Sequence, residues 1–172
     1  MKYSALLFDV YEKEESLKQT TQVLEADTNC CQIVVACRQE DLWKYAIKPT
    51  SKTMYVAMLE EKYPSLLNAL KAIVSENVLI FDLEKESSLE DIPMILEVLE
   101  KAPAVHKGNC CGFDTRLILF TLQKTLEEQL DLHAYLDAIQ TYADSPVVEL
   151  YRCRRLHLFF VAESLFFTRG LE

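Results

Sequence analysis

Two aspartates stand where they could share a metal ion. Asp9 follows the apolar run Tyr3–Phe8, and Asp82 follows the apolar run Val78–Phe81. If these runs form neighbouring parallel strands, both carboxylates lie at the carboxyl edge of one sheet, where α/β folds bind their ligands. Carboxylate oxygens are preferred ligands of Mg²⁺. Asp9 and Asp82 are therefore candidate Mg²⁺ ligands.

Asp82 also has a purely structural explanation. A strand can end on an aspartate that leads into a helix cap, and Ser87 with Glu90 has the spacing of a capping box. A single carboxylate holds a metal ion weakly. We favour this structural role for Asp82, with a Mg²⁺ or ribose contact as the functional alternative.

Apolar runs alternate with amphipathic runs along the chain, which predicts strands joined by helices. This alternation is typical of an α/β fold with a mainly parallel sheet, flanked by helices and connected by right-handed crossovers. We expect one domain over residues 1–172, with His106–Gly112 as a connector. The predicted strands are Tyr3–Phe8, Gln32–Cys37, Thr53–Met58, Val78–Phe81, Pro103–His106, Val147–Tyr151 and Leu156–Val161. The predicted helices cover residues 12–27, 39–47, 63–74, 87–100, 113–129 and 132–143, and a short one ends at Phe167.

Glycine is scarce where such a fold would bind phosphate. The chain has 3 glycines, and none precedes Gly108. Nucleotide-binding α/β folds use a glycine-rich turn after the first strand, because glycine lets backbone N–H groups approach phosphate closely. Here the residues after Phe8 read DVYEKEES, so a triphosphate would meet Glu12, Glu14 and Glu15. That encounter is repulsive.

The net charge of −9 excludes several classes of partner. A nucleic-acid-binding face needs basic residues, and so does adsorption to an anionic membrane. No uninterrupted apolar stretch approaches the roughly 20 residues of a membrane span, and the first apolar run is short for a secretory signal. We expect a cytoplasmic protein whose 6 cysteines are free thiols and not metal ligands.

Three segments resemble one enzyme family. They are VLEADTNCCQIVVACRQEDL (23–42), KYPSLLNALKAIVSENVLIFD (62–82) and LEEQLDLHAYLDAIQTYADSPVVELYRCRRLHL (126–158). In order and wording they are similar to the methylerythritol phosphate cytidylyltransferases and the related pentitol-phosphate cytidylyltransferases. The resemblance implies a Rossmann-like nucleotidyltransferase fold.

The resemblance also implies a residual nucleotide site. Lys62 stands where the family has an arginine, and Ser65 matches a serine that contacts the base. Asp82 matches an aspartate that helps to hold Mg²⁺ and nucleotide, and Lys85 stands at another arginine position. From the residues alone, Ser65 follows a proline at a helix start, so a role in the first helical turn is the structural alternative.

The sequence departs from the family pattern at two places. The glycine-rich phosphate loop is replaced by the acidic segment after Phe8. The family's β-arm, its usual dimer element, and its Asp-Thr-x-Lys substrate motif are replaced by the short segment PAVHKGNCCGFDTR (103–116).

Three hypotheses follow. The leading one is a shortened, non-catalytic pseudoenzyme without a cofactor, which either binds a protein partner or a second copy of itself or is retained without any chemistry. The alternative is a divergent Mg²⁺-dependent nucleotidyltransferase that uses Asp9 and Asp82 to transfer CMP from CTP to a sugar or polyol phosphate. The third is a subunit that pairs with an active homologue.

Overall fold

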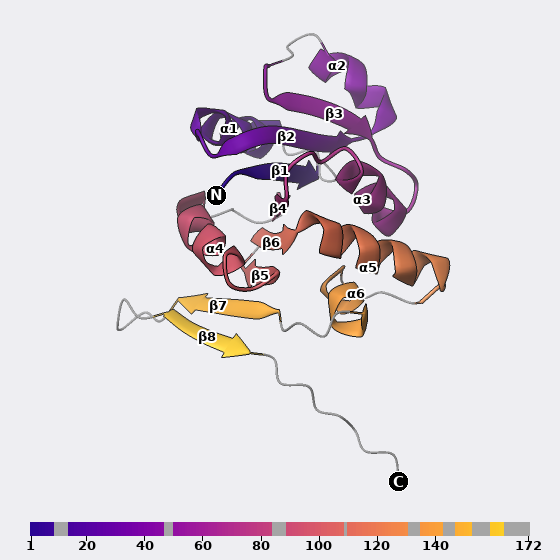
Figure 1. Cartoon of the computed structure of the whole chain (residues 1–172). Coiled ribbons are helices and arrows are strands. Elements are labelled where there is room, and N and C mark those ends of the chain that lie inside the picture. Colours follow the sequence, from indigo (N-terminus) through magenta and orange to yellow (C-terminus); the bar gives the residue numbers. More distant parts are fainter. Residues whose placement is uncertain are drawn as a thin grey trace.

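The computed structural model describes residues 1–8, 14–46, 50–83, 89–108, 110–130, 135–142, 147–152 and 159–163 (Figure 1). These residues form a single eight-stranded sheet in the order β3-β2-β1-β4-β6-β5-β7-β8. The strands are β1 (Tyr3–Phe8), β2 (Cys30–Cys37), β3 (Thr53–Ala57), β4 (Asn77–Asp82), β5 (Ala104–Lys107), β6 (Cys110–Asp114), β7 (Val148–Arg152) and β8 (Phe159–Glu163).

The sheet is mainly parallel, as the alternation of runs predicts. Strand β1 lies between β2 and β4 and is parallel to both, and β3 adds to β2 in the same direction. Strand β6 lies between β4 and β5 and is antiparallel to both, so β5 runs in the same direction as β4. Strand β7 is parallel to β5. Only β6 and β8 run against the other described strands.

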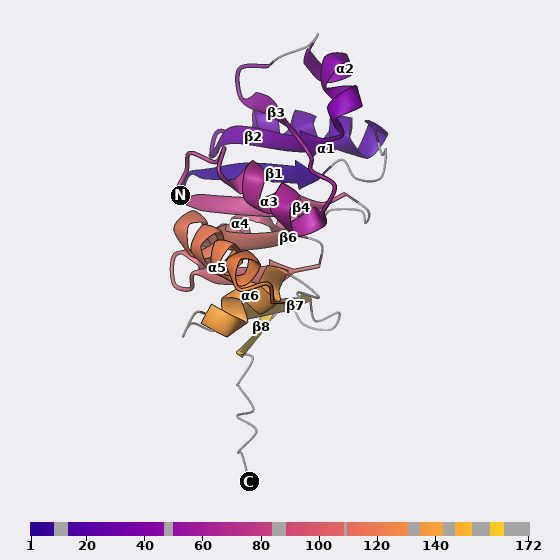
Figure 2. The same ribbon diagram turned by 90° about the vertical axis from the view of Figure 1, so that its right-hand side faces the viewer.

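Helices cover both faces of the sheet (Figures 1 and 2). Apolar side chains of α1 and α4 pack on one face, and those of α3, α5 and α6 pack on the other. The helices are α1 (Glu14–Ala26), α2 (Leu42–Ala46), α3 (Lys62–Leu70), α4 (Ile92–Leu99), α5 (Thr115–Glu127) and α6 (Tyr135–Tyr142). None of them combines the length and apolar character that crossing a bilayer requires. The final predicted helix, ending at Phe167, lies outside the described residues.

The sequence of helix α4 explains why this segment is helical and where the helix begins. Its buried residues Ile92, Ile95, Leu96 and Leu99 recur at the spacing of one helical face. Pro93 is tolerated because it lies in the first turn, where a missing N–H breaks no helical hydrogen bond. The helix therefore begins after a 3₁₀ turn and not at residue 87.

The prediction that His106–Gly112 is a connector is wrong, because this segment belongs to a hairpin formed by β5 and β6. Gly108 has φ of +62° and makes the turn that reverses the chain. The predicted helix from residue 113 instead begins at Thr115. Its N-cap is Asp114, whose carboxylate accepts a 3.0 Å hydrogen bond from the Leu117 N–H.

Gly112 explains how β6 fits beneath α4. A Cβ atom at this position would lie 2.8 Å from Cγ2 of Ile95 and 2.8 Å from Cδ1 of Leu99. A side chain here would require the side chains of Ile95 and Leu99 to shift. The glycine therefore allows β6 to pack closely against α4.

One buried polar group has no partner among the described residues. The hydroxyl of Thr115, at the first turn of α5, makes no hydrogen bond. Thr125 lies on the same helix, is also buried, and donates a 2.8 Å hydrogen bond to the carbonyl of Thr121. The two residues form a natural pair for measuring the cost of an unsatisfied hydroxyl.

We predict that Thr115→Val stabilises the protein by about 1 kcal/mol, because it removes a desolvated group that gains nothing in return. Thr125→Val should destabilise it by about 1 kcal/mol, because a formed hydrogen bond is lost. Urea unfolding measures both values. Equal destabilisation by the two substitutions would show that the Thr115 hydroxyl does have a partner.

Candidate functional site

The candidate site is the carboxyl edge of the parallel strands. The first four parallel strands end there at Phe8 (β1), Cys37 (β2), Ala57 (β3) and Asp82 (β4). Helices α1 and α3 begin at the same edge, because each follows a strand that ends there. Open α/β sheets bind ligands in the crevice beyond this edge, at the point where the strand order reverses. In this sheet that point lies between β1 and β4.

Asp82 lies at this reversal point. It is the last residue of β4, is half-buried, and pairs in register with Phe8 at the end of β1. The residue after Phe8 is Asp9, which lies outside the described residues, as does Lys85. The structure thus places Asp82 beside the end of the strand that leads to Asp9.

Lys62 and Ser65 both lie at the start of α3, at the same edge. Lys62 is the first residue of the helix and is exposed, whereas Ser65 is buried. The Ser65 hydroxyl accepts a 2.8 Å hydrogen bond from the Leu59 N–H. It lies 2.9 Å from the Leu59 carbonyl and 2.7 Å from that of Glu61. Its polar contacts therefore secure the connection between β3 and α3.

The first turn of α1 carries two exposed carboxylates. Glu14 and Glu15 occupy it, and Glu15 accepts a 3.1 Å hydrogen bond from the side-chain amide of Gln19. A helix N-terminus attracts negative charge, which is why phosphate groups bind there. In this chain the negative charge comes from the helix itself, and a phosphate group approaching the same turn meets repulsion.

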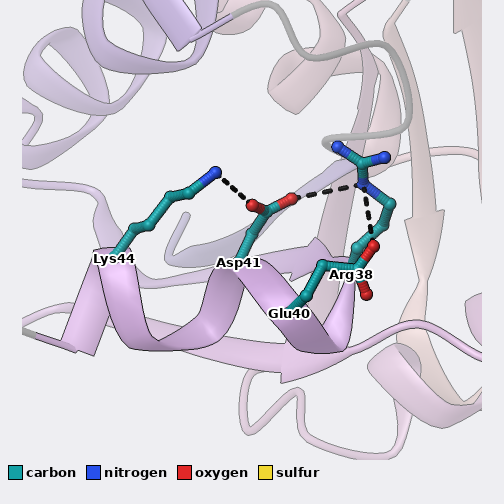
Figure 3. Close-up of polar contacts among 4 residues, drawn as sticks. All are labelled: Arg38, Glu40, Asp41 and Lys44. Carbon is teal, nitrogen blue, oxygen red and sulfur yellow. Dashed lines mark hydrogen bonds and ion pairs between the residues drawn. The ribbon is translucent and has the colours of Figure 1, made fainter.

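A network of charged side chains follows β2 (Figure 3). The Asp41 carboxylate lies between Lys44 and Arg38, with Nε of Arg38 at 3.2 Å from Oδ2 and Lys44 hydrogen-bonded to Oδ1. Nε of Arg38 also lies 3.8 Å from Oε1 of Glu40. The Asp41 side chain is 10% exposed, against 42% for Arg38 and 55% for Lys44.

The network fixes the charge of Asp41. The hydrogen bond from Lys44, aided by the charges of Lys44 and Arg38, outweighs desolvation and lowers the pKa of the Asp41 carboxyl. Both cations are thus engaged by an internal carboxylate. This network was not predicted from the sequence, although an Arg, an Asp and a Lys spaced three residues apart after a predicted strand are a usable signal.

A second ion pair lies at the end of β5. The Nζ atom of Lys107 is 2.7 Å from the Asp91 carboxylate, and the Lys107 side chain is only 7% exposed. The ion pair of Lys107 with Asp91 was not predicted from the sequence either, because its members are far apart in the chain.

Burial raises the pKa of the neighbouring Cys110 thiol well above its ordinary value. That thiol is therefore uncharged at neutral pH and a poor nucleophile.

None of the cysteines that the structure describes forms a disulfide bond; they are Cys30, Cys31, Cys37, Cys110 and Cys111. Burial also raises the pKa of Cys30, to about 11, which keeps its thiol protonated. Within the described ranges, no three His, Cys, Asp or Glu side chains come together as a possible metal site.

Solved structures, and not related sequences, identify the fold class of this chain. No family model matches the sequence, and no curated protein matches it. Solved structures do match. The 4-diphosphocytidyl-2C-methyl-D-erythritol synthase of Anaerococcus prevotii has a TM-score of 0.74 at 17% identity, covering 86% of each chain.

Two further structures match over a similar length. The 2-C-methyl-D-erythritol 4-phosphate cytidylyltransferase of Thermus thermophilus has a TM-score of 0.65 at 16% identity, over 87% of this chain and 88% of that one. The Rv0371c protein of Mycobacterium tuberculosis, in a complex with manganese, has a TM-score of 0.59 at 12% identity, over 87% of each chain.

These likenesses establish the class of fold. The chain has a Rossmann-like nucleotidyltransferase fold. Within that class its fold is that of the methylerythritol phosphate cytidylyltransferases, as the resemblance of the three sequence segments implies.

We predict that Asp41→Asn destabilises the protein at pH 7, because two cations lose their carboxylate. Since the folded-state pKa of Asp41 is lowered, its stabilisation is present above the unfolded pKa and is lost as pH falls through the folded pKa. The difference in unfolding free energy between wild type and variant should therefore shrink below about pH 4.

Urea unfolding at several pH values measures this difference. Glu97→Gln is the matched control, because Glu97 meets Lys101 at 4.0 Å in an exposed pair that contributes little. A difference for Asp41→Asn that stays constant from pH 7 to pH 3 contradicts the assignment.

Proposed function

We propose that this chain is a non-catalytic protein with a cytidylyltransferase-like fold, which acts by binding a protein partner. The observation that carries the proposal is the pair Glu14 and Glu15 in the first turn of α1. In this fold class the corresponding turn receives the phosphates of the nucleotide. Carboxylates there oppose the binding step on which nucleotidyl transfer depends.

The other groups at the edge support the proposal. Arg38 and Lys44 form ion pairs with Asp41. The Ser65 hydroxyl is hydrogen-bonded to the backbone of the segment between β3 and α3. The sequence from Asp9 to Lys13 contains no glycine to bring backbone N–H groups close to a phosphate. A nucleotide that bound through Arg38, Lys44 or Ser65 would have to disturb these existing contacts.

A second candidate function rests on Asp82. Its register with Phe8 brings it beside the strand end that leads to Asp9, and two such carboxylates could hold Mg²⁺. A structure of the same fold, the Mycobacterium tuberculosis Rv0371c protein, is a complex with manganese. On this alternative, the chain is a divergent nucleotidyltransferase that transfers CMP from CTP, with Lys62 and Lys85 as the phosphate-binding cations.

A turnover assay separates the two functions. We predict no CMP transfer from CTP to methylerythritol phosphate or to a pentitol phosphate, with Mg²⁺ or Mn²⁺ present. Release of pyrophosphate and mass spectrometry of the product measure it. An active cytidylyltransferase assayed in parallel shows that the conditions support turnover.

The decisive variant is Asp82→Ala. Metal-dependent turnover by the wild type that disappears in Asp82→Ala, but persists in the control Glu97→Ala, would replace the leading proposal with the second. Folding of both variants is checked by circular dichroism, so that a lost activity is not mistaken for a lost structure.

The partner is tested by purification. We predict that the tagged chain, isolated from its own cells, retains one protein in a fixed molar ratio through gel filtration at about 0.15 M and at about 0.5 M salt, where exposed charge pairs are screened. An unrelated tagged protein of similar negative charge controls for adsorption. Light scattering then distinguishes a second copy of the chain from a different protein.

The outcome of the purification distinguishes the three hypotheses for the role of the chain. A retained protein with cytidylyltransferase activity identifies the chain as a subunit that pairs with an active homologue. A retained protein without that activity, or a stable dimer of the chain, supports a binding role. A chain that is monomeric and alone at both salt concentrations contradicts the proposal.

A further inference from the structure

We draw no further inference here: the strongest candidate, the outer edge of strand β8 at the end of the sheet, carries nothing, because no described residue shows what covers it.

Discussion

The structure depends on the burial of strand β1. Its residues from Tyr3 to Leu7 are buried on both faces, so the strand needs a neighbour on each side and helices above and below. Strands β2 and β4 supply the neighbours, α1 and α4 one covering layer, and α3 and α5 the other. Because β1 to β4 are parallel, all four end at one edge. The polar groups that follow these strands therefore lie along one edge of the sheet.

Electrostatics at that edge determines what the fold can do. A nucleotidyltransferase fold needs uncompensated positive potential where the triphosphate binds. Here Glu14 and Glu15 occupy the first turn of α1, and Asp41 engages the cations that follow β2. The fold of the cytidylyltransferases is thus combined with an edge at which Asp41 pairs with Arg38 and Lys44 and two glutamates begin α1. On the proposed function, this arrangement of charge opposes the binding of a triphosphate.

Much of the fold is predictable from the sequence, because apolar runs such as Tyr3–Phe8 alternate with amphipathic runs at helical spacing. Strand β6 is not predictable, because its five residues include Gly112, whose need for close packing exists only once α4 lies above it. At the site, the spacing of Arg38, Asp41 and Lys44 is local and could have been recognised. The pair of Lys107 with Asp91 could not, since only the folded hairpin brings it together.

The proposed function requires that the carboxyl edge of the sheet does not bind a nucleoside triphosphate. A calorimetric titration of the wild-type chain with CTP in the presence of Mg²⁺ tests this requirement, followed in parallel by the fluorescence of Trp43, the chain's single tryptophan. We expect no saturable heat and no fluorescence change up to millimolar CTP. Stoichiometric binding that Asp82→Ala abolishes would overturn the proposal.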